Sequence, residues 1–308
     1  MEQVRRFNRA VTQRVGALND HYLARDRPLG EARVLWEIGA SGCDVRTLRA
    51  RLELDSGYLS RMLRSLEADG LVAVTAGDQD KRVRTAKLTR RGAGERRVLD
   101  KRSNALARSL LEPLSGAQRD RLVTAMSEVE RLLTAALVEL DVIDPAHRHA
   151  TYCVHEYFTE LDSRFDTGFD PNVTRAVDLD EVRPPNGLFL LATLRSEPVG
   201  CGALKFHGRK PAEIKRMWVA PSTRGLGVGR RLLADLETRA RDHGCGAVRL
   251  DTNRTLTEAI AMYRSSGYVE IEPFNDEPYA QHWFEKRLSR RSPVDRDAVR
   301  GVGMLLEP

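Results

Sequence analysis

Residues 213–232 read EIKRMWVAPSTRGLGVGRRL and decide the fold of the second half of the chain. The pattern predicts a half-buried strand, a Pro-Ser-Thr turn, a glycine-rich loop and then a helix. Glycine has no Cβ, so the backbone of Gly225, Gly227 and Gly229 can approach a ligand closely. The first N–H groups of the following helix lack intrahelical partners and favour an anion. We therefore expect this loop to hold a pyrophosphate.

Two common nucleotide-binding folds do not fit the surroundings of this loop. A P-loop needs Gly-Lys-Ser/Thr, whereas Gly229 is followed by two arginines. A dinucleotide-binding fold needs alternating strands and helices with an acidic residue about 20 residues on, a spacing that only Asp251 approaches. Consecutive strands joined by turns precede the loop instead, at 187–194, 198–206 and 212–219. This order predicts an antiparallel meander and not a doubly wound sheet.

At these residues the chain resembles the GNAT family of acetyl-CoA-dependent N-acetyltransferases. The cofactor loop of that family reads Arg/Gln-x-x-Gly-x-Gly/Ala, which Arg224, Gly227 and Gly229 match. The strand at 213–219 lies upstream, and AMYRSSGY at 261–268 is similar to the Tyr-x-x-x-Gly-Tyr/Phe helix end of the family. The resemblance covers residues 151–288. It implies a GNAT domain over 150–288 that uses acetyl-CoA and has an α+β fold with a mixed, mostly antiparallel sheet.

The resemblance also implies a cofactor site on the strand end and the loop. The expected cofactor-binding residues are Met217, Trp218, Val219, Arg224, Gly225, Leu226, Gly227, Val228, Gly229, Arg230, Asn253 and Tyr263. The backbone N–H groups of 217–219 would bind the pantetheine arm and polarise the thioester carbonyl, as in an oxyanion hole.

Acetyl transfer to an amine needs a base for the ammonium proton and a proton donor for the leaving thiolate. Glu213 is the expected base, acting through water, and His207 is the alternative because imidazole titrates near neutrality. Glu213 could instead be a solvated partner of Lys215 or Lys205. Tyr263 is the expected proton donor, with an ordinary core aromatic as the other interpretation.

The first half of the chain carries the whole net charge of +6. Residues 1–150 hold 27 lysines and arginines against 21 aspartates and glutamates. The segment 81–102 alone has ten basic residues against Glu95 and Asp100. Such a cluster attracts phosphates and makes binding depend on salt, although a solvated helix face can have a similar composition.

Two short amphipathic helices, at 44–52 and 56–69, predict a helix-turn-helix. Leu59, Leu63 and Leu66 recur at core spacing in the second helix, which leaves its polar side chains for a DNA groove. Strands at 71–75 and 84–88 are expected to form a hairpin whose tip reaches a minor groove. The expected DNA-binding residues are Ser56, Tyr58, Ser60, Arg61, Arg64, Lys81, Arg82 and Arg84.

These residues resemble a MarR-type winged helix, since LEADGL at 66–71, DQDKR at 78–82 and LTRRG at 88–92 fall in the family order. The resemblance covers residues 1–140. It implies that helices at 2–22, 91–111 and 118–140 form a homodimer, which would bind a pseudo-palindromic double-stranded DNA operator. It also implies a pocket for a small aromatic effector near Trp36, His21 and Tyr22, with ordinary packing as the alternative.

The length of 308 residues fits two domains. We expect a winged-helix domain over 1–140, a linker at 141–149, the GNAT domain over 150–288 and a mobile tail at 289–308. The four cysteines lack metal-ligand spacing, so reduced structural thiols and no metal are expected. No apolar run reaches the ~20 residues that span a bilayer, which favours a cytoplasmic protein without a membrane partner.

The combined prediction is a transcriptional regulator that also acetylates a primary amine, either a small molecule or a protein lysine. A second hypothesis keeps the GNAT domain as a catalytically silent sensor whose ligand modulates DNA binding. A third makes the first half only a dimerisation module, which would not require the basic cluster at 81–102.

Overall fold

The computed structural model describes residues 1–17, 22–76, 83–173, 178–208 and 210–289. The chain divides into two compact units, Met1–Glu128 and Val129–Pro308. A helical first unit and an α+β second unit confirm the predicted fold class. Within the described ranges, no helix is both long and apolar enough to cross a membrane.

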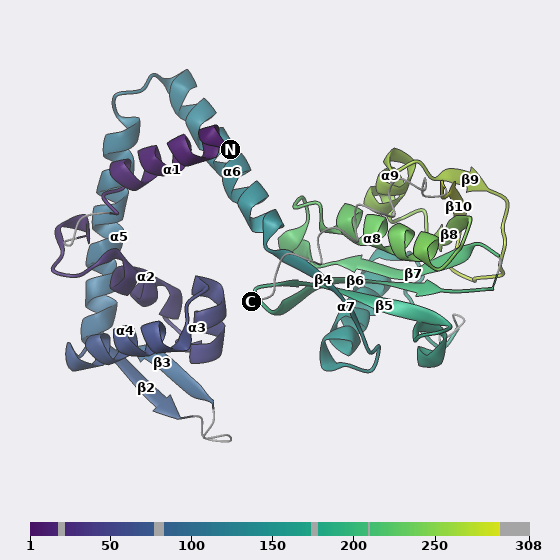
Figure 1. Ribbon diagram of the computed structural model, residues 1–308, viewed down its shortest axis with the longest axis horizontal. Coiled ribbons are helices and arrows are strands. Elements are labelled where there is room, and N and C mark those ends of the chain that lie inside the picture. Colours follow the sequence, from purple (N-terminus) through teal and green to yellow (C-terminus); the bar gives the residue numbers. More distant parts are fainter. Residues whose placement is uncertain (18–21, 77–82, 174–177, 209, 290–308) are drawn as a thin grey trace, which may run out of the picture. The chain divides into compact units, whose positions relative to one another are not determined.

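The N-terminal unit consists of helices around a small antiparallel sheet of strand order β1-β3-β2 (Figure 1). Its helices are α1 Glu2–Arg14, η1 Tyr22–Ala24, α2 Leu29–Ile38, α3 Val45–Leu52, α4 Ser56–Ala68 and α5 Arg90–Leu111, followed by α6 Gly116–Ala136. Its strands are β1 Cys43–Asp44, β2 Val72–Ala76 and β3 Arg84–Leu88. The predicted helix-turn-helix and the two hairpin strands are confirmed.

Side-chain caps fix where the two helices of this motif begin. The carboxylate of Asp44 accepts backbone N–H groups in the first turn of α3, and Asp55 does the same for α4. Leu59, Leu63 and Leu66 of α4 are buried in the core of the unit, as their spacing predicts. Burial of this stripe directs the other face of α4 to solvent.

The C-terminal unit contains a seven-stranded sheet of order β4-β5-β6-β7-β8-β10-β9. The strands are β4 Val138–Ile143, β5 Gly187–Leu194, β6 Glu197–Lys205, β7 Ala212–Val219, β8 Ala247–Thr252, β9 Val269–Ile271 and β10 His282–Arg287. The helices are α7 Arg148–Arg164, η2 Leu179–Val182, η3 Pro221–Thr223, α8 Val228–Asp242 and α9 Thr257–Ser265. Among the strands of the described residues only β7 and β8 pair in parallel, so the predicted mixed, mostly antiparallel sheet is confirmed.

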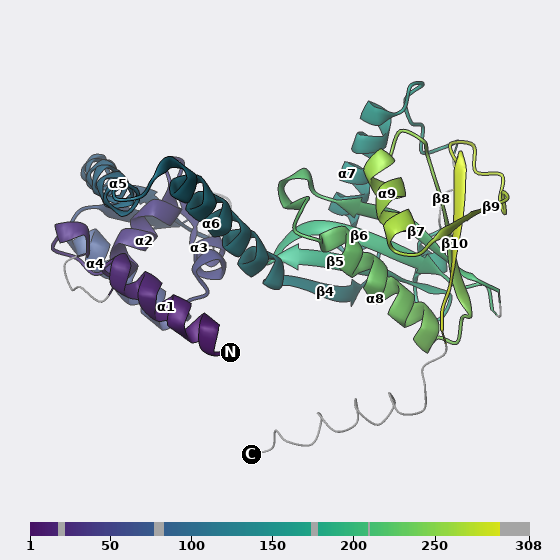
Figure 2. The same ribbon diagram turned by 90° about the horizontal axis from the view of Figure 1, so that it is seen from above.

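Helices cover both faces of this sheet (Figures 1 and 2). Leu232 and Leu236 of α8 pack with Phe284 of β10 in one core. Cys153 of α7 packs with Phe189 of β5 in a second core on the other face. Burial on both faces explains the continuous apolar run of β5, which does not alternate.

The expected linker at 141–149 is wrong for its first residues. Val138–Ile143 form β4, which pairs in register with Phe189 to Leu194 of β5. Alternating apolar and acidic residues from 138 to 142 suit an edge strand with one buried face, and Val138 is buried. The same residues end α6 at Ala136, four residues before the end of the expected helix.

All four cysteines, Cys43, Cys153, Cys201 and Cys245, are buried free thiols. Residues 290–308 lie outside the described residues, so the mobile tail stays a prediction.

Candidate functional site

The glycine loop takes a backbone conformation that glycine favours. Gly225 and Gly227 have φ values of +82° and +79°, in the left-handed region. A Cβ at either position would meet no atom within 4 Å, so the conformation and not the space calls for glycine. Gly227 is the N-cap of α8 and supplies no side-chain cap. The first N–H groups of α8 therefore remain available to an anion.

Strands β7 and β8 part just before this loop. They pair only at Ala212 with Val248 and at Glu213 with Arg249. On the other side of β7, the register with β6 shifts between Cys201 and Ala203, and Arg216 has a φ of +54°. A bulge of this kind bends a strand. Beyond Glu213 the two strands therefore leave a gap, and two cavities lie beside it.

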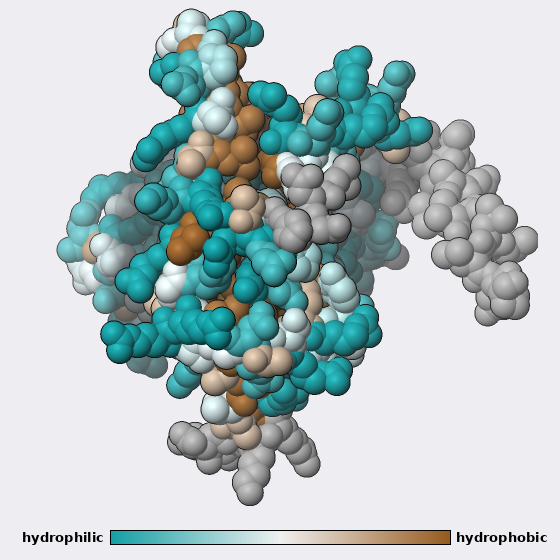
Figure 3. Space-filling view, turned by 90° about the vertical axis from the view of Figure 1, so that its left-hand side faces the viewer, coloured by the Kyte–Doolittle hydropathy of each residue, from teal (hydrophilic) through white to brown (hydrophobic). Residues whose placement is uncertain are grey.

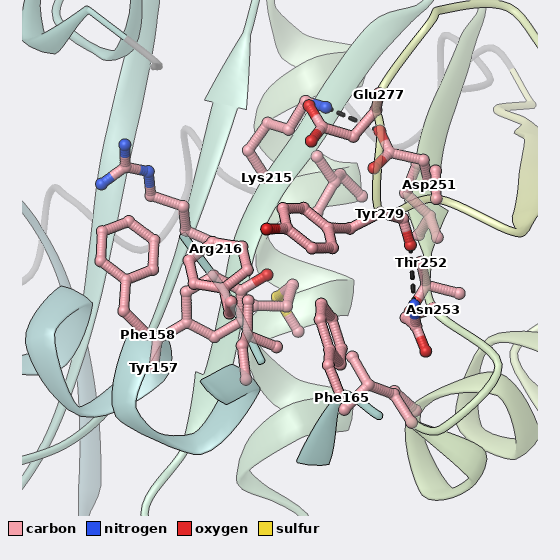
Figure 4. Close-up of a pocket in the computed structure, with 18 of the residues that line it drawn as sticks. Tyr157, Phe158, Phe165, Lys215, Arg216, Asp251, Thr252, Asn253, Glu277 and Tyr279 are labelled. Atoms are coloured by element: carbon pink, nitrogen blue, oxygen red, sulfur yellow. Dashed lines mark hydrogen bonds and ion pairs between the residues drawn. The ribbon is translucent and has the colours of Figure 1, made fainter. Parts of the chain in front are cut away.

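The loop cavity has a volume of about 470 Å³ and the aromatic cavity about 120 Å³. The loop cavity is lined by the strand end, the glycine loop and the start of α8: Met217, Trp218, Val219, Arg224, Gly225, Gly227, Val228, Gly229 and Arg230. The aromatic cavity is lined by Phe158, Phe165, Phe169 and Tyr279, with Lys215, Arg216, Asp251 and Glu277 (Figure 4). Both cavities share Tyr157, Leu161, Met217, Leu256, Ala259 and Tyr263. A group held in one cavity can thus meet a group held in the other.

Two tyrosines stand at this junction, Tyr157 of α7 and Tyr263 of α9. Burial, followed by the charge of Asp251, raises the pKa of Tyr263 well above its usual value. Burial also raises the pKa of Tyr157, with smaller contributions from Tyr263 and Asp251. Both hydroxyls therefore keep their protons at neutral pH and can donate them. The motif at 261–268 marks Tyr263, whereas no motif marks Tyr157.

Glu213 belongs to a buried polar cluster and lines neither cavity. Lys215 Nζ lies 3.0 Å from its Oε1, and His207 Nε2 lies 3.0 Å from its Oε2. Burial raises the pKa of Glu213, but the charge of Lys215 and the hydrogen bonds from Lys215 and His207 lower it further, so that the net shift is downward. The structure therefore contains the alternative pairing of Glu213 with Lys215, although the pair is buried and not solvated.

The position of Glu213 follows from the strand pairing. Glu213 lies where β7 and β8 are still paired, before the point at which the strands part. Asp251, at the other end of the same cluster, does line the aromatic cavity. Its Oδ1 accepts hydrogen bonds from Lys215 at 2.6 Å and from Asn275 at 3.0 Å. Asp251 is not among the site residues expected from the sequence, because the parting of the strands has no signal in the spacing of the residues.

Two of the expected cofactor residues lie elsewhere. Asn253 lines the aromatic cavity and donates from Nδ2 to the backbone oxygen of Tyr279 at 2.8 Å. Leu226 packs against the sheet core, because its side chain is the apolar one in an otherwise polar and glycine-rich loop. Neither residue lines the loop cavity.

The exposed face of α4 carries the expected DNA-binding side chains. Ser56, Tyr58, Arg61 and Arg64 are exposed, and Ser60 is half-buried. The Arg61 guanidinium lies 5.7 Å from the centre of the Tyr58 ring. Arg84 is exposed at the start of β3. Lys81 and Arg82, together with the expected hairpin tip at 77–82, lie outside the described residues.

Helix α1 exposes apolar side chains and buries none within the described unit. Val4, Phe7 and Val11 are 58%, 43% and 40% exposed and follow one face of the helix. In α6, Val123 and Met126 are also exposed. Figure 3 shows hydrophobic residues gathered in the upper part of one face of this unit. An apolar surface of this kind is typical of an interface.

The aromatic residues proposed for an effector pocket pack against one another. The rings of Tyr22 and Trp36 meet edge to face, with centroids 6.3 Å apart. Tyr22 is buried, and Trp36 Nε1 donates to Asp100 at 2.5 Å. This packing fits the alternative in the sequence analysis, and His21 lies outside the described residues. The effector pocket stays a prediction.

Comparison with known proteins finds a family match within each unit. Residues 154–268 match the family described as Acetyltransferase (GNAT) family, and residues 26–83 match the MarR family. An IAA acetyltransferase of Azospirillum brasilense is 35% identical over 127 residues, which are 41% of this chain and 82% of that protein. The N-alpha-acetyltransferase RimI of Mycobacterium tuberculosis is 31% identical over 115 residues, which are 36% of this chain and 70% of that protein.

Solved structures also resemble the chain over about half its length. A GNAT-family acetyltransferase from Staphylococcus aureus has 19% identity and a TM-score of 0.42, and covers 49% of this chain and 100% of its own. A GNAT-family acetyltransferase from Elizabethkingia anophelis with acetyl-CoA bound has 16% identity and a TM-score of 0.37, and covers 49% of this chain and 99% of its own.

Proposed function

The chain belongs to the GNAT acetyltransferase family, and from this premise we propose that it transfers the acetyl group of acetyl-CoA to a primary amine while its MarR-type unit binds DNA. The observation that carries the proposal is the meeting of two cavities at Tyr157 and Tyr263. One cavity has the features of an anion site, and the other is walled by aromatic side chains.

The residues of the loop cavity fit acetyl-CoA. The glycine loop and the uncapped start of α8 offer backbone N–H groups to the pyrophosphate. Arg230 adds positive charge beside it, whereas Arg224 is paired with Glu160, which lines the same cavity. The strand end from Met217 to Val219 would take the pantetheine arm. When bound there, acetyl-CoA supplies an activated acyl carbon to the amine.

Residues at the junction of the two cavities carry out the proton transfers. The Tyr263 hydroxyl, protonated at neutral pH, is the proposed donor to the departing sulfur. Glu213 is retained as a proposed base, and Asp251 is added because its carboxylate lines the aromatic cavity. Lys215 pairs with both carboxylates, so Asp251 and Glu213 belong to one polar cluster. A proton accepted by Asp251 therefore enters the cluster that contains Glu213.

Two surfaces of the N-terminal unit support the proposal of a DNA-binding homodimer. The exposed face of α4 would enter a major groove of a pseudo-palindromic operator, with Arg61 and Arg64 contacting bases or phosphates. The apolar face of α1 would pack against the partner in the dimer, which then presents two α4 helices about one helical turn of DNA apart.

The position of Glu213 outside both cavities favours one second candidate, a silent domain that senses acetyl-CoA or another ligand. One experiment separates the two. The full chain is mixed with acetyl-CoA and a panel of amines while free CoA thiol is followed, and DNA affinity is measured with and without acetyl-CoA. Amine-dependent CoA release supports the enzyme. Shifted DNA affinity without any release supports the sensor.

A further inference from the structure

Two arginines join the end of helix α6 to the segments proposed to hold the pyrophosphate. From α6, the Arg131 guanidinium donates a hydrogen bond to the backbone oxygen of Gly225 in the glycine loop. From α8, the Arg231 guanidinium donates to the backbone oxygens of Ala135 and Val138, each at 2.7 Å. All five residues belong to the C-terminal unit. The end of α6 and the cofactor loop are therefore linked in both directions.

The hydrogen bonds from Arg231 stabilise the end of α6. The last four carbonyl groups of a helix have no intrahelical partner, and the helix dipole places negative charge beside them. Ala135 lies one residue before the end of α6, so its carbonyl is one of these groups. Arg231 lies in the first turn of α8, the same turn that offers N–H groups to an anion. The start of α8 thus contacts α6 as well as the loop cavity.

Helix α6 passes from one unit into the other. Residues 116–128 belong to the N-terminal unit, and residues 129–136 belong to the C-terminal unit. After Gly116 the helix contains no glycine or proline, so nothing in its sequence introduces a kink between the two parts. The first part carries the exposed apolar side chains of Val123 and Met126. One helix therefore connects part of the expected dimer surface with the cofactor loop.

The loop itself can couple the two contacts. Gly225 lines the loop cavity, and a glycine segment loses much conformational entropy when it becomes ordered. A pyrophosphate bound to the N–H groups of the loop and the hydrogen bond from Arg131 order the same segment. The contact that forms second therefore costs less entropy, so each contact favours the other.

We propose that Arg131 is a positioning residue of the acetyl-CoA site, and that it couples occupancy of this site to the part of α6 that lies in the N-terminal unit. This role rests on the proposed acetyl-CoA site, whose regulation it describes. Such coupling is reciprocal: bound acetyl-CoA holds α6 on the loop, and α6 held on the loop strengthens acetyl-CoA binding. Helix α6 lies outside residues 26–83 and 154–268, which match the two families, so the contact is a feature of the joined chain.

Hydrogen exchange of the full chain, followed by mass spectrometry with and without saturating acetyl-CoA, tests the coupling. In the wild type, acetyl-CoA should slow amide exchange about 3- to 10-fold in residues 129–136 and in residues 116–128. In Arg131→Met the protection of residues 116–128 should disappear, and titration calorimetry should show acetyl-CoA binding weakened about 3- to 10-fold. Arg131→Lys keeps a donor and should restore part of both effects.

Arg119→Met is the matched control. Arg119 also lies on α6 and also donates to backbone oxygens, those of Leu111 and Glu112, but both partners belong to the N-terminal unit. This variant should leave the affinity for acetyl-CoA and the protection of α6 unchanged.

Two results would overturn the coupling: protection that stops within the loop and α8, or protection of residues 116–128 that persists in Arg131→Met. If Arg131→Met does not fold, the exchange pattern of the wild type still decides. Transfer assays separate this coupling from the proposed function. Acetyl-CoA that is turned over without protecting α6 rejects the coupling and keeps the transferase. Protection of α6 without CoA release in the presence of amines rejects the transferase and keeps the coupling, whereas acetyl-CoA that does not bind rejects both.

Discussion

The ammonium of Lys215 on β7 lies 2.6 Å from a carboxylate oxygen of Asp251 on β8. The pair connects the two strands beyond the point where their backbone pairing ends, and both side chains line the aromatic cavity. Burial opposes the charged form of Lys215, but Asp251 and Glu213 outweigh it and raise its pKa. The cluster therefore contributes both to the stability of the unit and to the charge of the cavity.

Replacing Lys215 with methionine should destabilise the chain by about 3–5 kcal/mol, because it removes the cation that pairs with both the buried Glu213 and the half-buried Asp251. Urea denaturation followed by tryptophan fluorescence measures the loss. Lys205→Met is the matched control, since the Lys205–Glu181 pair is more exposed and should be worth about 0–1 kcal/mol. Equal losses in the two variants would contradict the importance of the cluster.

The same cluster predicts how stability depends on pH. The lowered pKa of Glu213 means that its contribution is complete above its usual value of about 4.5 and is lost as pH falls through the lower folded value. The raised pKa of Lys215 means that its contribution is complete below about 10.5 and is lost as pH rises through the higher folded value. Melting temperatures of the wild type and Lys215→Met should differ most between these limits. A constant difference from pH 3 to 11 would be inconsistent with this linkage.

Gly227→Ala should weaken acetyl-CoA binding, because alanine disfavours the left-handed conformation at the N-cap of α8 by about 1–2 kcal/mol. Calorimetric titration with acetyl-CoA measures the effect. Gly244→Ala is the control, since Gly244 has a φ of +97° and equally free space but lines neither cavity. Unchanged affinity in Gly227→Ala would remove the loop from the cofactor site.

Tyr263→Phe should slow turnover by about 10²–10⁴-fold, the usual contribution of a general acid, with little change in acetyl-CoA affinity. Steady-state kinetics and a separate binding titration give the two quantities. Tyr268→Phe provides the control, because Tyr268 is also buried, its ring lies 5.8 Å from that of Tyr263, and it lines neither cavity. Turnover that stays at the wild-type rate in Tyr263→Phe would return Tyr263 to an ordinary core role.

Substitutions should distinguish the two proposed bases, Asp251 and Glu213. Asp251→Asn should lower kcat with the amine more than Glu213→Gln does, because only Asp251 lines the cavity. Rates measured across pH, together with melting temperatures to exclude unfolding, provide the comparison. A larger loss in Glu213→Gln at equal stability would assign the base to Glu213.

Arg61→Ala and Arg64→Ala should each weaken DNA binding. If each arginine contacts one phosphate, the slope of log K against log salt should fall by about 0.9 per substitution. Fluorescence anisotropy at several salt concentrations measures this slope. Arg254→Ala, an exposed arginine of the other unit, serves as the charge-matched control. Slopes that do not differ from the control would exclude phosphate contacts by α4.

Local signals in the sequence predicted most of the fold. The capping aspartates and leucine spacing predicted α3 and α4, and the glycine loop predicted the start of α8, since each signal lies within a few residues of its element. The edge strand β4 was missed, because a short alternating segment directly after a helix extends the apolar helical pattern.

The site was predictable only in part. The loop cavity follows from contiguous residues, so nearly all of its expected lining is in place. The aromatic cavity depends on a bulge at Arg216, on the parting of β7 from β8 and on rings from α7 and from the segment before β10. These features arise from contacts between distant segments, and no local spacing encodes them.

Acetyl transfer at the junction of the two cavities is tested by isotope labelling. The full chain is incubated with isotope-labelled acetyl-CoA and a panel of primary amines, and the products are identified by mass spectrometry. We expect the labelled acetyl group on the amine nitrogen in reactions of the wild type and Tyr268→Phe, with much less of this product from Tyr263→Phe. Labelled product formed equally by all three proteins, or acetyl-CoA that binds without labelling any amine of the panel, would contradict this expectation.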